Sequence, residues 1–230
     1  MTLAIILFME LHPPKNDGWL AVPSPSFTRH QKYWLFRPGA LTAGLRRLGH
    51  VELRVVAEHT DGLRASEAWM LRREIRSPVW VREIIMSIDG VDSVFARSFT
   101  PLQAAHGLWQ GMRRLRTRPL ADMLYNDPQI TRSGFFARRL SPQQPMYRSI
   151  RRVLTNESAQ TASVQGRRAS EDEPAICSGR PCPDARRLLA RCSVFWRCGQ
   201  PLLVAECFLP EFWALSARSM HARGLALKEV

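Results

Sequence analysis

The sequence predicts one compact domain in which strands joined as hairpins are combined with short amphipathic helices. Strand-like alternation on both sides of Asp89-Gly90 indicates a hairpin with a two-residue turn. Leucines recur at helical spacing from Leu41 to Leu48 and are followed by Gly49, a helix stop signal. With 45% hydrophobic and 23% charged residues, the 230-residue chain can form a core, and its length suits a single domain.

The remaining elements follow from local patterns and from proline and glycine positions. Pro101 and Pro119 each suit the first turn of a helix, because the fixed φ of proline is helical. β-branched and aromatic residues mark the strands, and Cys198-Gly199 marks a second hairpin turn. The expected elements are a helix over 41–48, a strand over 51–58, a helical turn over 66–73, strands over 79–88 and 91–99, helices over 101–113 and 120–125, and strands over 129–138, 188–197 and 202–209.

Composition divides the chain into a domain with appendages. Prolines and weak periodicity predict that residues 1–34 form a poorly ordered N-terminal extension. Residues 156–184 contain few large apolar side chains to offset their ordering entropy, which predicts a mobile insert. The domain is expected over 35–212, followed by a helical C-terminal tail over 213–230.

The net charge of +13 suggests a nucleic-acid-binding protein, but its distribution weakens that interpretation. Only Lys15, Lys32 and Lys228 of the 33 basic residues are lysines, and the arginines are spread along the whole chain. We therefore expect no nucleic-acid partner. No apolar run approaches the roughly 20 residues of a membrane-spanning helix, so no membrane insertion is expected either.

The cysteines give no sign of a disulfide framework or a metal site. They are odd in number, form no C-x-x-C pair and have no histidine close by, so we expect no metal and a reducing, cytoplasmic setting. The apolar run from Leu3 to Met9 lacks the basic flank and the cleavage site of a secretory signal. The five cysteines are Cys177, Cys182, Cys192, Cys198 and Cys207.

The first hairpin places Arg82 in a row of apolar side chains. A two-residue turn at Asp89-Gly90 pairs Ile88 with Val91, and continuing that register places Arg82 opposite Arg97. Two opposed arginines repel each other unless an anion lies between them. Alternatively, both snorkel outward or meet a carboxylate from a neighbouring strand. The same register places Trp80 opposite Phe99 and Ile84 opposite Phe95.

Glu206 also occupies an apolar row, because Val204 and Phe208 share its face of the last strand. A carboxylate at such a position can belong to a ligand site. Alternatively, it pairs with Arg191 or Arg197 of the preceding strand.

Leu120 is a candidate through its backbone. Pro119 at the first helical position leaves the Leu120 N–H among the unpaired donors of the first turn, where a carboxylate can bind. The alternative is an ordinary capped helix.

Three separated blocks together resemble the bacterial chorismate–pyruvate lyases: VWVREIIMSIDGVDSVFARSFTP, RPLADMLY and GQPLLVAECFLP. The resemblance covers roughly residues 35–140 and 186–212. It implies an α+β domain with an antiparallel sheet of about six strands, helices over one face and an enclosed ligand cavity. It also implies release of pyruvate from chorismate to give 4-hydroxybenzoate, the ring precursor of ubiquinone, without metal or organic cofactor. We expect a monomer.

The resemblance also assigns site residues. Arg82 in the W-x-R-E strand and the Leu120 N–H would hold the ring carboxylate, and Arg97 of the return strand would attract the enolpyruvyl carboxylate. Glu206 of the E-x-F-L-P strand would bind the ring hydroxyl and assist proton movement, which makes Glu206 and Arg82 the expected catalytic residues. Leu41, at the start of the first helix, would add a substrate contact.

A non-catalytic sensor of aromatic carboxylates is the alternative function. The effector domains of one class of transcription regulators resemble this fold, but they follow a winged-helix DNA-binding domain. Only about 34 residues precede the first expected helix, too few for such a domain, so the enzyme is the expectation. A basic nucleic-acid-binding protein is the third hypothesis.

Overall fold

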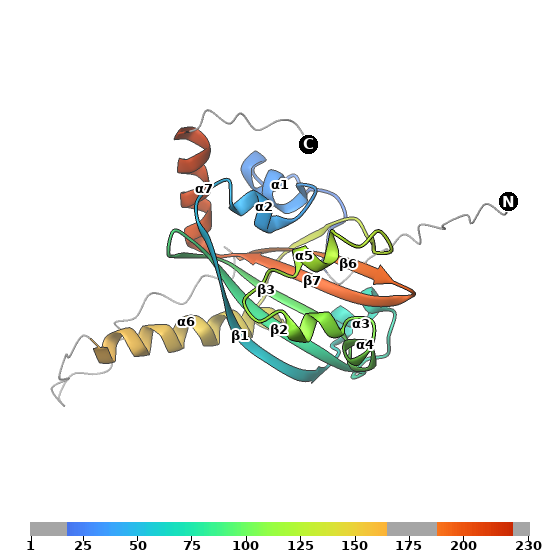
Figure 1. The fold of residues 1–230 in the computed structure, drawn as a ribbon. Helices are drawn as coiled ribbons and strands as arrows, with labels where there is room; N and C mark the ends of the chain where they lie inside the picture. Colours follow the sequence, from blue (N-terminus) through green and yellow to red (C-terminus); the bar gives the residue numbers. More distant parts are fainter. Residues whose placement is uncertain (1–17, 165–187, 223–230) are drawn as a thin grey trace.

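The computed structural model describes residues 18–164 and 188–222, which form an antiparallel sheet with helices packed against it (Figure 1). Seven strands pair in the order β1-β2-β3-β7-β6-β4, and β5 also pairs with β6. The α+β class with an antiparallel sheet is confirmed. The strands are β1 (Val51–Gly62), β2 (Pro78–Ile88), β3 (Val91–Pro101), β4 (Thr131–Arg132), β5 (Phe136–Arg139), β6 (Leu189–Arg197) and β7 (Gln200–Phe208).

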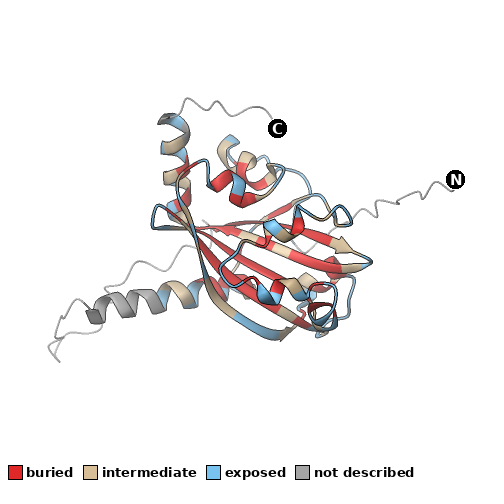
Figure 2. Cartoon of the chain, in the orientation of Figure 1, coloured by how far each residue is buried: buried red, intermediate tan, exposed pale blue. Residues whose placement is uncertain are grey.

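Helices cover both faces of the sheet rather than the one face expected. The central strands are buried along nearly their whole length (Figure 2), so each face has to be shielded from water. One face packs against α1 (Arg29–Phe36), α2 (Leu41–Leu45) and α7 (Pro210–Ala222), and the other against α3 (Ala65–Leu71) and α6 (Pro145–Val164). The segments α4 (Leu102–His106), η1 (Gln110–Arg114) and α5 (Ala121–Leu124) form a third cluster with the ends of β6 and β7.

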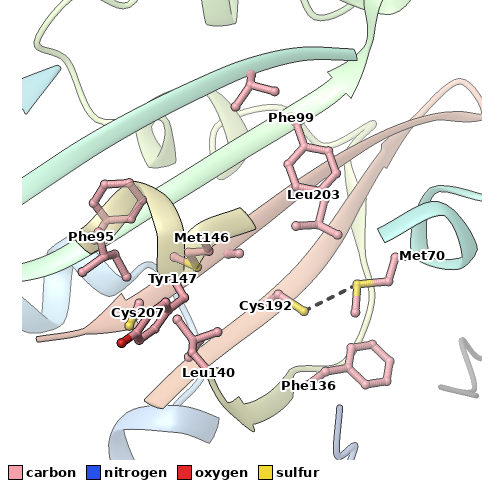
Figure 3. Packing of buried hydrophobic residues seen from close by; sticks show 14 of the residues in the cluster. Met70, Phe95, Phe99, Phe136, Leu140, Met146, Tyr147, Cys192, Leu203 and Cys207 are labelled. Atoms are coloured by element: carbon pink, nitrogen blue, oxygen red, sulfur yellow. Dashed lines mark hydrogen bonds between the residues drawn. The ribbon is translucent and has the colours of Figure 1, made fainter. Parts of the chain in front are cut away.

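The core on the α6 side is built from large side chains (Figure 3). Phe95 and Phe99 of β3 and Leu203 of β7 point to this side, where they join Met146 and Tyr147 of α6. All five side chains are less than a tenth exposed. Because burial of a large apolar side chain contributes about 1.5–3 kcal/mol, this layer is a main source of stability.

Both hairpin turns form as predicted. Asp89 and Gly90 have φ values of 48° and 78°, and Cys198 and Gly199 have 46° and 74°. Two consecutive residues with positive φ give the turn whose twist matches the twist of paired strands. The β6–β7 register then continues without a shift from Arg197 opposite Gln200 to Leu189 opposite Phe208.

The β2–β3 register shifts by one residue close to its turn. Ile88 faces Val91 as expected, but Met86 faces Val94 while Ser87 faces Asp92, so Ser93 is an additional residue. The buried Ser93 carbonyl accepts a hydrogen bond of 2.9 Å from the Leu209 N–H.

This β-bulge reverses the faces of the outer part of β3, because a shift of one residue moves every side chain to the other side of a sheet. Arg82 lies opposite Ser98, and Arg97 lies opposite Glu83. The expected pairing of Arg82 with Arg97 is therefore wrong, and the two guanidiniums lie on opposite faces. Trp80 faces Thr100 and Ile84 faces Ala96, in place of Phe99 and Phe95.

The expected domain boundaries need correction at two places. Phe27 and Trp34 are buried, and α1 packs on the sheet, so the domain begins before residue 35. Helix α6 continues to Val164 and so occupies the first part of the expected insert. Residues 165–184 of that insert lie outside the described residues, as do 1–17 of the extension and 223–230 of the tail. No helix in the described part of the chain is long and apolar enough to cross a membrane.

Candidate active site

A cavity lies between the sheet and the segments around α2 and α5, on the face that carries the even-numbered residues of β2 and β3. Its enclosed volume is about 50 Å³, and all the empty space counted out into the solvent at its mouth is about 530 Å³. Most of the wall is apolar. The lining includes Leu41, Thr42, Leu53, Ile84, Met86, Ala96, Ser98, Leu120, Leu124, Tyr125, Phe135, Arg191, Ser193, Phe195, Val204 and Glu206.

An ion pair forms the charged part of the wall. The β6–β7 register places Arg191 opposite Glu206, and Arg191 Nε donates to Glu206 Oε2 over 2.7 Å. Of the two partners considered for Glu206, Arg191 is the one found. Arg197 instead pairs with Asp127 at 3.1 Å. Glu206 therefore lines the cavity and is at the same time paired with Arg191.

The Arg191 guanidinium is anchored on several sides. Its Nη1 donates to the carbonyl oxygens of Trp34, at 3.1 Å, and Arg37, at 3.3 Å. The group also lies over the ring of Phe135, with 4.4 Å between its central carbon and the ring centroid. The side chain is only 1% exposed. A buried guanidinium held in this way has little freedom to move when a ligand enters.

Leu120 and Leu41 both line the cavity. Leu120 precedes α5, whose first residue is Ala121, so the helix begins one residue later than predicted. Within the described residues, no hydrogen bond uses the Leu120 N–H. Leu41 is the first residue of α2 and is buried. The two helix starts thus face the sheet across the cavity.

Arg82 lies beside the cavity but is not part of its wall. It shares a face with Ile84 and is opposite Ser98, both of which line the cavity. Its Nη1 contacts Glu58 Oε1 at 3.0 Å, and its Nη2 donates to the Arg116 carbonyl. Burial lowers the pKa of Arg82, and the neighbouring Glu58 carboxylate opposes that shift. The carboxylate comes from a neighbouring strand, as the alternative interpretation of this arginine proposed.

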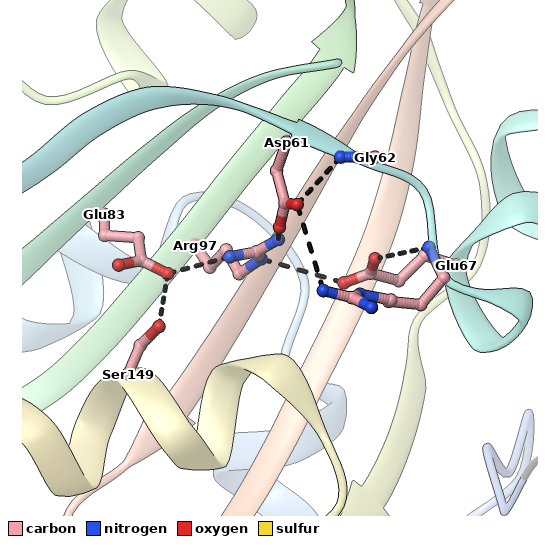
Figure 4. Close-up of polar contacts among 7 residues, drawn as sticks. Asp61, Gly62, Glu67, Glu83, Arg97 and Ser149 are labelled. Carbon is pink, nitrogen blue, oxygen red and sulfur yellow. Dashed lines mark hydrogen bonds and ion pairs between the residues drawn. The ribbon is translucent and has the colours of Figure 1, made fainter. Parts of the chain in front are cut away.

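Arg97 is placed away from the cavity, on the face covered by α3 and α6 (Figure 4). Its Nη1 donates to Glu83 Oε1 at 2.9 Å, and its Nη2 lies 3.4 Å from Asp61 Oδ2. Its Nε is 3.7 Å from Glu67 Oε1. The expectation that Arg97 shares one anion pocket with Arg82 is therefore wrong, because the bulge at Ser93 turns it to the other side.

The carboxylates around Arg97 differ in their proton affinity. Burial raises the pKa of Glu67, and Arg97 offsets only part of that effect. Burial also acts to raise the pKa of Asp61, but hydrogen bonds from the Gly62 N–H and from Arg97 outweigh it, so this pKa is lowered. The Ser149 hydroxyl of α6 donates to Glu83 over 2.7 Å. These ion pairs and hydrogen bonds join β1, β2, β3, α3 and α6 on the side of the sheet away from the cavity.

Comparison with known proteins identifies the family. The sequence profile of chorismate lyase matches residues 15–218. The chain belongs to the chorismate lyase family. A probable chorismate pyruvate-lyase of Bordetella pertussis is 54% identical over 210 residues, covering 91% of this chain and 97% of the relative. A namesake in Bordetella avium is 52% identical, covering 87% of each chain.

More distant similarities extend the comparison. Probable chorismate pyruvate-lyase 1 of Pseudomonas entomophila is 36% identical, covering 87% of this chain and 93% of the relative. Among solved structures, the effector domain of PhnF from Mycobacterium smegmatis is 14% identical, with a TM-score of 0.43, and the match covers 75% of this chain and 90% of that one.

In this member of the chorismate lyase family, sequence reasoning missed Glu58 as the partner of Arg82 and left Arg191 as one of two candidate partners of Glu206. The role of Glu58 as the partner of Arg82 depends on a second register shift, between Val55 and Ala57, which no local pattern reveals. The two-residue turn at Cys198-Gly199 decides between the two candidates, because it fixes Arg191 opposite Glu206 and Arg197 opposite Gln200. In the described ranges, no three histidine, cysteine or carboxylate side chains come together to hold a metal ion.

Proposed function

We propose that this chain eliminates pyruvate from chorismate and leaves 4-hydroxybenzoate in the cavity described above. Membership of the chorismate lyase family is the observation that carries the proposal. The cavity supports it, because an apolar wall suits a six-membered ring and the polar groups converge at a few points. Leu41, Leu120 and Glu206 all lie in that wall.

The substrate's ring carboxylate binds at the Leu120 N–H, with Arg82 beside it, and the ring hydroxyl donates to Glu206. In the reaction the ether bond between the ring and the enolpyruvyl oxygen breaks, and the ring carbon bearing the hydroxyl loses its proton. The enol takes up a proton and becomes pyruvate, while the ring becomes aromatic. Because aromatisation supplies driving force, orientation of the substrate and stabilisation of developing charge are the main tasks of the site.

The test is incubation of the purified full-length chain with chorismate. We expect 4-hydroxybenzoate, measured by absorbance after separation, and pyruvate, measured with lactate dehydrogenase, in equal amounts. Binding of 4-hydroxybenzoate without turnover of chorismate would favour the sensor instead. Absence of both binding and turnover would reject the proposed function and its alternative.

Glu206→Gln tests whether the carboxylate takes part in the chemistry. If it assists proton movement, turnover falls by about 10²-fold or more while product affinity changes little. Unchanged turnover would rule out this role, and small parallel changes in turnover and affinity would leave Glu206 only an anchor for the hydroxyl. Glu52→Gln is the matched control, because Glu52 is exposed on β1 and does not line the cavity.

The wider setting belongs to the same proposal. The product would supply the ring for ubiquinone synthesis, and the reaction would take place in the cytoplasm. The chain would work as a monomer, without metal, organic cofactor or nucleic-acid partner. Quinone content of a strain lacking this gene, with and without added 4-hydroxybenzoate, tests the pathway.

A further inference from the structure

Under the proposed function, the ligand carries a second carboxylate that the site has to accommodate. Chorismate bears its enolpyruvyl group on the ring carbon next to the one that bears the hydroxyl. The ring carboxylate lies on the opposite side of the ring. Arg97, expected to receive the second carboxylate, lies on the far face of the sheet. A different cation therefore has to meet that charge.

Arg191 is the only arginine or lysine among the described residues that line the cavity. Its Nε and Nη1 are occupied by Glu206 Oε2 and by two backbone carbonyls. Among the described residues, Nη2 has no hydrogen-bond partner, and neither does Glu206 Oε1. The pair thus retains one donor group and one acceptor atom on neighbouring side chains.

We propose that Arg191 binds the enolpyruvyl carboxylate through Nη2 and determines the preference of the site for chorismate over 4-hydroxybenzoate. The inference rests on the proposed function. The hydroxyl and the enolpyruvyl group are on neighbouring ring carbons. Glu206 and Arg191 are likewise neighbours in the cavity wall, with 2.7 Å between Glu206 Oε2 and Arg191 Nε. A ligand that gives its hydroxyl to Glu206 therefore presents its second carboxylate to Arg191.

A single guanidinium can serve two carboxylates at different nitrogens, and this molecule already contains an example. Arg97 uses its terminal nitrogens for Glu83 and Asp61. Arg191 would act in the same way, with Glu206 on Nε and the ligand on Nη2. Its anchors at Trp34 and Arg37 keep the group in place when the product, which lacks the second carboxylate, remains bound.

The test measures ligand binding in the Glu206→Gln background, where no charged carboxylate is left unpaired when Arg191 is replaced. Dissociation constants are measured for chorismate, for 4-hydroxybenzoate and for 4-hydroxyisophthalate, a stable acid with a second carboxylate next to the hydroxyl. Adding Arg191→Met should weaken both dicarboxylates about tenfold or more and 4-hydroxybenzoate less than about threefold. Arg191→Lys, which retains the charge, should restore part of the difference.

Arg197→Met in the same background is the control, because Arg197 lies on the same strand outside the cavity wall. It should change none of the three affinities. The proposal would be overturned if Arg191→Met weakened the binding of all three ligands equally, including by misfolding that Arg191→Lys does not repair. It would also be overturned if Arg191→Met weakened the binding of none of them. The native chain could fail to turn over chorismate while Arg191→Met still selectively weakens the binding of 4-hydroxyisophthalate. In that case the proposed function is wrong and the second-carboxylate site at Arg191 stands.

Discussion

Replacement of Arg97 by methionine should damage stability and leave ligand binding intact. The Arg97 side chain is 4% exposed and contacts carboxylates of Asp61, Glu67 and Glu83. Methionine fills similar space without charge, so the variant leaves these acids without their shared cation. Removal of one partner from a buried ion pair costs about 3–5 kcal/mol, because the remaining charge is uncompensated.

This cost is measurable by urea unfolding and by thermal unfolding. For a chain of this size, a loss of about 1 kcal/mol lowers Tm by roughly 2–4 °C, so we expect Arg97→Met to lower it by roughly 6–20 °C. Arg54→Met is the matched control: Arg54 pairs with Asp92 at 3.3 Å on the same sheet, but its side chain is half exposed. Exposed pairs contribute about 0–1 kcal/mol.

The affinity for chorismate, unlike the stability, should be nearly unchanged in Arg97→Met. Because Arg97 is on the face away from the cavity, the folded fraction of Arg97→Met should retain the native KM within about twofold. A variant of native stability whose KM for chorismate rises tenfold would refute this reasoning and return Arg97 to the ligand site. Adding Glu83→Gln to Arg97→Met should recover part of the lost stability, because it removes one unpaired buried charge.

Two further variants test the neighbouring groups. Arg82→Met should raise KM for chorismate and Ki for 4-hydroxybenzoate by the same factor, because both ligands carry the ring carboxylate. A charge-assisted hydrogen bond contributes about 1.5–3 kcal/mol to binding, so we expect a factor of roughly 10 to 150. Unequal changes in the two constants would contradict the assignment of Arg82 to the ring carboxylate. Glu67→Gln tests the raised pKa of Glu67. Because the folded state binds the proton of Glu67 more tightly than the unfolded chain does, the native protein gains stability as pH falls through the folded-state pKa. The gain is complete below the unfolded-state pKa. Urea unfolding should therefore show the native protein gaining stability relative to Glu67→Gln as pH is lowered toward 4.5, the ordinary pKa of a glutamate. A constant difference would contradict it.

Local signals predicted the hairpins and the short helices, because turn chemistry and apolar spacing act over a few residues. Asp89-Gly90 and Cys198-Gly199 both form the expected turns. The bulge at Ser93 has no comparable signal, since its carbonyl is satisfied by Leu209, far along the chain. The register near the turn was therefore predictable, and the register beyond it was not.

The candidate site shows the same distinction between positions that follow from local signals and positions that depend on the bulge. Glu206, Leu120 and Leu41 line the cavity, because their positions depend on an unshifted hairpin and on two helix starts. Arg97 was misplaced because its face depends on the bulge. Helix α6 was missed although Met146 and Ile150 recur at helical spacing, and its side chains are what cover the face to which Arg97 points.

The additional residue in β3 also decides how much room a ligand has. Without Ser93, the strand beyond it would turn over, and Phe95 and Phe99 would point to the side where Ala96 and Ser98 now line the cavity. Two benzyl groups would then fill a space that a methyl and a hydroxymethyl group leave empty. The additional residue Ser93 therefore places the bulky side chains in the core on the α6 side of the sheet, and the cavity stays open because β3 contains one residue more than regular pairing requires.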